Sequence, residues 1–171
     1  RLGKKALWPA SLRLFATCCR AGVKLEAWPV FSETPEKENA SLRIRLAQGS
    51  TYLPRAWQEC FRPALPELAE DLLNLLEEVI RDAHRLACSL GQADDCTNRQ
   101  LLTRSQIQVH SAYGGEGDLG RVITWFTEIV THLAQKTPGL SPIRIESWLG
   151  ARDPVLHRVS LHALTETTRM T

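Results

Sequence analysis

Hydrophobic residues recur at helical spacing in several separate stretches of the chain. In the longest, 68–91, apolar residues three and four positions apart alternate with charged ones, which predicts an amphipathic helix that ends at a glycine. The same spacing predicts helices over 7–21 and 119–134. Prolines punctuate the segment 52–66, where a shorter helix is expected.

Two short helices are predicted near the C-terminal end, over 140–149 and 155–164. They open at Ser141 and Asp153, each of which is followed by proline. A side-chain oxygen at the N-cap accepts a hydrogen bond from a free backbone amide, and proline at the next position has no amide to satisfy. Two such starts in succession predict a stacked antiparallel pair. Asp118 is expected to cap the helix before them in the same way.

The segment 40–48 fits two structures. Apolar residues at positions 42, 44 and 46 alternate with Arg43 and Arg45, which is the pattern of a strand. A lone strand leaves its backbone groups unpaired, and the nearest apolar piece, 25–31, is interrupted by Pro29. We therefore interpret 40–48 as a short helix with an arginine face.

These elements predict an all-α fold of stacked antiparallel helices, a HEAT-like helical repeat array of about seven helices. With 171 residues, 43% of them apolar and 23% charged, the chain is large enough for a single domain, 1–171, with its own core. Residues 92–117, rich in Asp, Asn, Ser and Gly, are expected to form an irregular connecting loop. Because the chain begins with Arg1 rather than methionine, we expect it to be a fragment of a larger protein.

Charge is distributed unevenly along the chain. Residues 1–50 hold nine Lys or Arg against four Asp or Glu, whereas residues 51–100 hold five against nine, and the net charge is +2. This imbalance favours docking between segments or with a protein partner. The chain lacks the dense clusters of basic residues that strong phosphate binding requires. Four arginines, Arg43, Arg45, Arg55 and Arg62, come nearest to a basic stacking surface with Trp57, although a solvated basic face is the favoured interpretation. Nucleic-acid binding through the basic N-terminal part therefore stays an alternative.

Cysteine usage and hydropathy indicate the cellular compartment in which the protein is expected. The five cysteines are odd in number, include the adjacent pair Cys18 and Cys19, and show no Cys-x-x-Cys spacing, which is typical of reduced thiols. No apolar run approaches the roughly 20 residues that span a bilayer. We expect an intracellular, cytoplasmic protein without a membrane partner.

One glycine motif matches a known phosphate-binding pattern. Residues 115–120 read G-x-G-x-x-G, open a predicted helix and follow the apolar segment 107–109. Such glycines let backbone amides approach a pyrophosphate, but Glu116 and Asp118 would repel it, and the chain lacks the alternating strands and helices of a dinucleotide-binding sheet. We interpret the motif as a loop and cap, and a small nucleotide-binding or hydrolytic domain using 105–120 remains the alternative.

The candidate contact residues come from loops and polar helix faces. The five histidines show no metal-ligand spacing, and no nucleophile with its base and orienting acid can be assembled. An enzymatic role thus stays open but disfavoured, and no catalytic residue, metal or cofactor is assigned. The residues expected to contact a partner are Arg43, Arg45, Trp57, His110, Tyr113, His157 and Arg158.

Segments of the chain resemble a known class of helical regions. Residues 153–164 look like the second helix of a HEAT-type repeat. Three segments in order, 53–57, 105–110 and 145–164, resemble the helical C-terminal region of large bacterial sirtuin-like and nucleotide-binding proteins associated with phage defence. After His110 the chain departs from that pattern, since residues 111–113 read Ser-Ala-Tyr where acidic and polar residues are expected.

The resemblance implies a scaffold or sensor region attached to an effector, not the effector itself. No sirtuin-type catalytic motif occurs in these residues. Repeat helices stack on their neighbours and leave a surface for partners. The sequence therefore predicts a non-catalytic helical interaction module of a larger intracellular protein, a sensor region in bacterial defence being one role.

Overall fold

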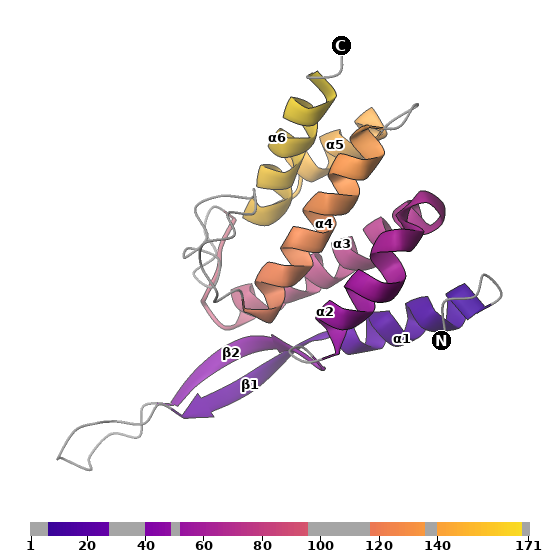
Figure 1. The fold of residues 1–171 in the computed structure, drawn as a ribbon. Helices are drawn as coiled ribbons and strands as arrows, with labels where there is room; N and C mark the ends of the chain where they lie inside the picture. The colour runs from indigo at the N-terminus through magenta and orange to yellow at the C-terminus, as the bar shows by residue number, and fades with distance from the viewer. Residues whose placement is uncertain (1–6, 28–39, 49–51, 96–116, 136–139, 169–171) are drawn as a thin grey trace, which may run out of the picture.

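The computed structural model describes residues 7–27, 40–48, 52–95, 117–135 and 140–168, and most of them are helical (Figure 1). The five longer helices are α1 (Trp8–Cys19), α3 (Leu65–Ser89), α4 (Asp118–Ala134), α5 (Pro142–Leu149) and α6 (Pro154–Thr168). Before α3, helix α2 (Leu53–Ala56) runs into a π turn, Trp57–Phe61, and a 3-10 turn, Arg62–Ala64. These bounds confirm the helices predicted over 7–21, 52–66, 68–91, 119–134, 140–149 and 155–164.

The helix predicted over 40–48 is wrong. Strand β2 (Ala40–Leu46) pairs antiparallel with β1 (Ala21–Ala27) in a two-stranded sheet. The partner strand was missed although Val23 and Leu25 flank Lys24 with the same period of two. Because β1 satisfies backbone groups of β2, the objection to a lone strand does not apply. The fold is therefore mostly helical with a small sheet.

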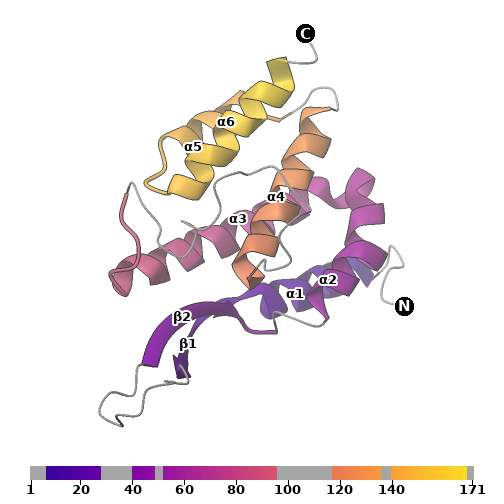
Figure 2. The same ribbon diagram turned by 60° about the vertical axis from the view of Figure 1, so that its left-hand side comes forward.

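Helix α3 is the central element of the bundle. Its apolar stripe faces inward, and Leu72, Leu73 and Leu76 are fully buried. Figures 1 and 2 show α4 crossing α3, with the α5–α6 pair on one side of α4 and α1 with α2 on the other. In both views the β-hairpin projects from the bundle at the end away from α6.

An aromatic cluster joins α1, the π turn and α4. The rings of Phe15 and Phe61 lie 4.4 Å apart between centroids, and those of Trp57 and Trp125 stack at 5.2 Å. Aromatic pairs at such distances add about 0.5–1.5 kcal/mol each to the free energy gained by burial. Trp57 of the π turn and Trp148 of α5 are both fully buried.

The predicted helix caps have different outcomes. Asp153 caps α6, because its Oδ1 accepts hydrogen bonds from the amides of Val155 at 2.8 Å and Leu156 at 3.4 Å. Ser141 occupies the N-cap position of α5 without a side-chain capping bond. The prediction for Asp118 is wrong: Gly117 is the N-cap of α4, and Asp118 is the first helical residue. There a carboxylate still interacts favourably with the positive end of the helix dipole.

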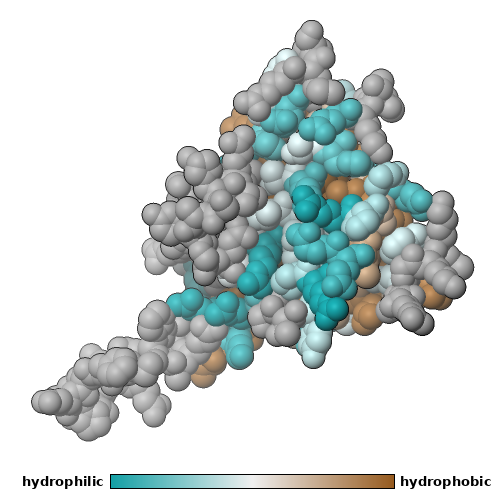
Figure 3. All heavy atoms as spheres, in the orientation of Figure 1, coloured by the Kyte–Doolittle hydropathy of each residue, from teal (hydrophilic) through white to brown (hydrophobic). Residues whose placement is uncertain are grey.

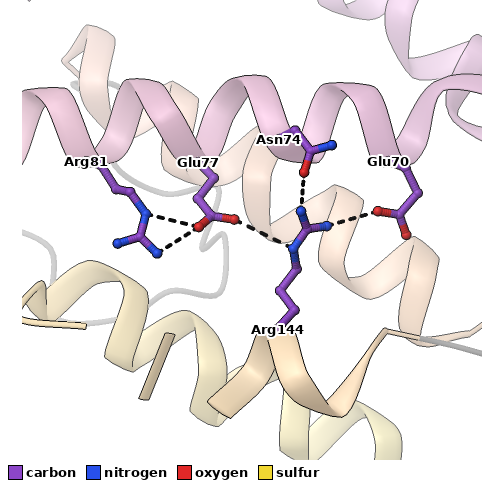
Figure 4. A network of polar contacts seen from close by, with 5 residues as sticks. All are labelled: Glu70, Asn74, Glu77, Arg81 and Arg144. Atoms are coloured by element: carbon purple, nitrogen blue, oxygen red, sulfur yellow. Dashed lines mark hydrogen bonds and ion pairs between the residues drawn. The ribbon is translucent and has the colours of Figure 1, made fainter. Parts of the chain in front are cut away.

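A polar network fastens α5 to α3 (Figure 4). Arg144 of α5 donates from Nη1 to Glu70 Oε2 at 2.9 Å and from Nη2 to Asn74 Oδ1, and its Nε lies 3.7 Å from Glu77 Oε2. The other oxygen of Glu77 accepts from Arg81 Nη2 at 2.8 Å. Glu70, Asn74 and Glu77 are spaced by four and three, so they share one face of α3. One arginine fork therefore connects two turns of α3 to α5.

Replacing Arg144 with alanine is expected to lower the free energy of unfolding by about 1 kcal/mol, because the network is partly exposed and water competes for its bonds. Arg144→Lys keeps the charge but not the planar fork, so it should recover only part of that loss. Urea unfolding at low and high salt measures both variants. Equal stability of Arg144→Ala and wild type at low salt would show that the network contributes nothing.

Candidate interaction site

The two faces of the β-hairpin differ in chemistry. The register pairs Val23 with Ile44 and Leu25 with Leu42, so these four apolar residues share one face. At the root of the hairpin this face is buried, and Ile44 packs against Ala83 and Ala87 of α3 in a small hydrophobic cluster. Burial of the root anchors the hairpin to the helical bundle.

Beyond the root, the same apolar face is open to solvent. Val23 is 45% exposed, Leu25 64% and Leu42 43%, whereas Ile44 next to them is 5% exposed. In Figure 3 hydrophilic side chains cover much of the helical face turned to the viewer, and hydrophobic surface appears both near the hairpin and at the right-hand side of the helices. Contiguous exposed apolar side chains mark interaction surfaces more often than isolated ones do. We call Val23, Leu25 and Leu42 the hairpin apolar patch.

The opposite face of the hairpin is basic. Lys24 lies directly across from Arg43, and Arg45 lies across from Gly22. Arg45 also reaches the start of α4, since its Nη1 is 4.0 Å from where a Cβ on Gly117 would lie. The predicted contact residues Arg43 and Arg45 thus lie together, with Lys24, on one element.

The C-terminal end of α3 supports the hairpin. Gly91 has a φ of +66°, the left-handed conformation that ends the helix, and its amide bonds to Cys88 O at 3.0 Å while that of Gln92 bonds to Ala87 O at 2.8 Å. Gln92 follows this turn, and its Nε2 donates to the carbonyl of Leu42 at 2.8 Å. The helix end predicted at this glycine is confirmed, and it fixes β2 from outside the sheet.

Trp57, His157 and Arg158, which were also predicted to contact a partner, are not part of this surface. Trp57 is fully buried and donates from Nε1 to Glu128 Oε2 at 3.2 Å, so its assignment as a contact residue is corrected: it belongs to the core. Arg158 is exposed and His157 half-buried on α6, which Figures 1 and 2 place far from the hairpin. His110 and Tyr113 lie outside the described residues.

Sequence reasoning missed the apolar half of the hairpin surface. Val23 and Leu25 carry it together with Leu42, but 21–27 was not interpreted as a strand. The signal that could have found it is the alternation of apolar and charged residues directly after α1, which matches that of 40–46.

A second polar cluster joins the end of α3 to the start of α6. Asp153 is 3% exposed, and burial raises its pKa; the charge of His84, the backbone amides of Val155 and Leu156, and Arg81 oppose that rise. His84 is also buried, and its Nε2 lies 3.5 Å from the thiol of Cys88.

This cluster lacks the features of a reaction or metal centre. Desolvation and the negative charges of Asp95, Asp153 and Asp94 raise the pKa of the Cys88 thiol, which keeps it protonated rather than nucleophilic. No group of three or more His, Cys, Asp or Glu side chains among the described residues is arranged to hold a metal ion. We interpret the cluster as a structural contact between the end of α3 and the start of α6.

The pH dependence of stability is expected to change in Asp153→Asn. Because folding raises the pKa of Asp153 above its ordinary 3.8, the folded state binds its proton more tightly. That contribution to stability is complete below pH 3.8 and is lost as the pH rises through the raised folded pKa. Asparagine caps equally well but does not titrate. The stability of Asp153→Asn relative to wild type should therefore increase with pH above 3.8 and then level off.

Thermal unfolding over a pH series measures this difference. Asp153→Ala is the control, because it removes the charge and also the cap, and it should cost about 1 kcal/mol more than the asparagine variant. A constant difference between Asp153→Asn and wild type across the series would contradict the raised pKa.

The described part of the glycine motif opens helix α4. Of its residues, 117–120 are described, and they form the N-cap and first turn of α4. Asp118 Oδ1 lies 3.9 Å from Arg121 Nη1, so a carboxylate and its counter-ion occupy this helix start. The sheet that the structure describes has two antiparallel strands, unlike the parallel sheet such a site requires. Residues 105–116 lie outside the described part.

Comparison of the chain with protein-family models, with curated proteins and with solved structures finds no match. The likeness to the helical region of sirtuin-like defence proteins therefore stays a prediction. Among the described helices, none combines the length and the apolar character needed to cross a bilayer.

Proposed function

We propose that this chain is a non-catalytic interaction module of a larger intracellular protein, with helices stacked in a HEAT-like manner, and that its β-hairpin contacts a protein partner. The single observation that carries the proposal is the hairpin apolar patch. Its three residues continue a face that is buried at the root and becomes exposed toward the tip.

Physical reasoning supports a partner for this surface. A two-stranded hairpin is only marginally stable in water unless its apolar face is covered. Here the bundle covers Ile44 and Leu46 but leaves Leu25 mostly exposed. Full burial of a valine or leucine side chain contributes about 1.5–3 kcal/mol. Because Val23, Leu25 and Leu42 are already partly buried, covering the rest of each contributes about half of that, which still provides part of a binding free energy.

The helical bundle supplies the rigid support that a docking element needs. The hairpin is fixed by Ala83 and Ala87 beneath it and by Gln92 beside it. A preorganised element loses less conformational entropy on binding. A sensor region of a bacterial defence protein is the role that the resemblance suggests, and the partner would then be either the effector domain or a protein that it detects.

Substitution of Leu25 by serine tests the proposal. We expect Leu25→Ser to reduce capture of a specific protein by the tagged chain about tenfold, since it removes the most exposed member of the patch. Leu14→Ser on α1 is the matched control, because Leu14 is similarly exposed, at 54%. Quantitative mass spectrometry of proteins retained from a bacterial lysate measures both. Equal losses in the two variants, or none in either, would refute the assignment to the hairpin.

A further inference from the structure

We infer that a second copy of this chain pairs with the outer edge of β1, so that the two β1 strands run antiparallel and the two hairpins form one continuous sheet. This pairing uses the edge of the hairpin, whereas the proposed function uses its apolar face, so neither depends on the other. It is carried by the direction of the backbone groups of β1 and by the order of the charges along that strand.

The hydrogen bonds of the hairpin show which backbone groups of β1 point outward. The amide of Ala47 donates to the carbonyl of Arg20 at 2.9 Å, so these two residues form a hydrogen-bonded pair. Bonded and non-bonded pairs alternate along an antiparallel ladder. Along β1 from Arg20, Val23 and Leu25 therefore both fall in non-bonded pairs, and their N–H and C=O groups point away from β2.

The two edges of the hairpin have different surroundings. On the outer edge of β2 the carbonyl of Leu42 accepts a hydrogen bond from Gln92 at 2.8 Å, and Figures 1 and 2 place β2 between β1 and the start of α4. No described residue forms a hydrogen bond with the outward groups of Val23 and Leu25. An edge strand of this kind is a template for another strand, because its backbone groups offer regularly spaced hydrogen bonds. The edge that can receive a further strand is therefore that of β1.

The charges of β1 favour a copy of the same strand as the one added. A two-fold axis at Leu25 would place Lys24 of each chain opposite Glu26 of the other, because these two residues flank Leu25. Leu25 would form a bonded pair with its copy, as would Val23 with Ala27 of the copy. Lys24 and Glu26 would then form non-bonded pairs, in which the two residues lie closest, and opposite charges across strands are favourable. The strand is thus self-complementary in charge.

The same register would extend the apolar face of the sheet. Residues directly opposite each other lie on one face, so Leu42, Leu25 and their copies would form a single row across the joined sheet. Leu25 is the most exposed member of the hairpin apolar patch, and its copy would cover part of it. An isolated hairpin is marginally stable in water, whereas a sheet of more strands with an apolar face is not. Pairing would therefore stabilise the hairpin and widen the patch.

The experiment exchanges the two charges and measures association of the full chain by sedimentation velocity at concentrations up to about 100 μM. Lys24→Glu and Glu26→Lys are studied separately and as an equimolar mixture. Each variant alone would place like charges opposite each other, whereas a heterodimer of the two restores both attractive pairs. Arg55→Glu is the control, because it makes the same kind of charge reversal as Lys24→Glu at an exposed position of α2. Circular dichroism establishes that each variant is folded.

We expect wild type and the control to be dimeric in this range, each single variant to dimerise about tenfold more weakly, and the mixture to regain the association of wild type. A dimer that neither variant weakens, or that the mixture does not restore, would overturn the pairing of the two β1 strands. A monomeric wild type would overturn it as well, and capture of another protein that depends on Lys24 and Glu26 would then assign the edge to that protein. Failure of Leu25→Ser to reduce capture, with the charge exchange behaving as expected, would refute the proposed function and leave the pairing intact.

Discussion

Trp57→Ala is expected to lower the free energy of unfolding by about 3–5 kcal/mol, the typical cost of truncating a fully buried tryptophan. The substitution removes the stacking of Trp57 on Trp125 and leaves a cavity between the π turn and α4. It also removes the indole donor from Glu128, whose bond to Arg62 remains. Urea or guanidinium unfolding monitored by circular dichroism measures the change.

A nearby substitution provides the control for this experiment. Tyr52 directly precedes α2 and is 74% exposed, so Tyr52→Ala should change the free energy of unfolding by no more than about 0.5 kcal/mol. If Trp57→Ala costs less than about 1 kcal/mol, the aromatic cluster is not the core of the N-terminal half.

Trp148→Ala should have a comparable effect, about 3–5 kcal/mol, at the other end of the molecule. Trp148 is fully buried in α5, and its ring lies 5.4 Å from that of Phe126 in α4. Loss of this contact removes an apolar attachment of the α5–α6 pair to α4. In hydrogen exchange, amides of α5 and α6 should therefore lose protection before those of α3.

The two tryptophans are expected to differ when each is replaced by phenylalanine. Trp57 Nε1 donates to Glu128, whereas Trp148 Nε1 has no hydrogen-bond partner among the described residues. Trp57→Phe loses a hydrogen bond to a charged acceptor and should cost about 1 kcal/mol more than Trp148→Phe. Equal costs would show that the bond to Glu128 contributes no net stability.

The helices could be predicted because their signals are local. The leucine spacing of α3 lies within one segment, and Gly91 ends it by a backbone conformation that glycine adopts easily. Asp153 likewise satisfies amides two and three residues away. Such features are fixed by neighbouring residues, so they are visible without knowledge of the fold.

The pairing of the two hairpin strands and the burial of Trp57 depend on contacts between segments that are distant in the sequence. Strand β2 pairs with β1, and the alternation in 40–46 was set aside because no partner strand was recognised in the sequence. Trp57 was expected at the surface because arginines are near it in sequence. Its burial is decided by Trp125 and by Glu128, 71 positions along the chain. Arg43 and Arg45 could therefore be named as contact residues, but not the apolar patch behind them.

Site-specific photo-crosslinking in bacterial cells tests the central claim most directly. A photoreactive amino acid replaces Leu25 in the hairpin in one variant and Leu14 in α1, which is similarly exposed, in another. The proposal predicts a discrete protein adduct from position 25 that is absent from position 14. No adduct from position 25, or the same adducts from both positions, would contradict the assignment of the hairpin as the docking element.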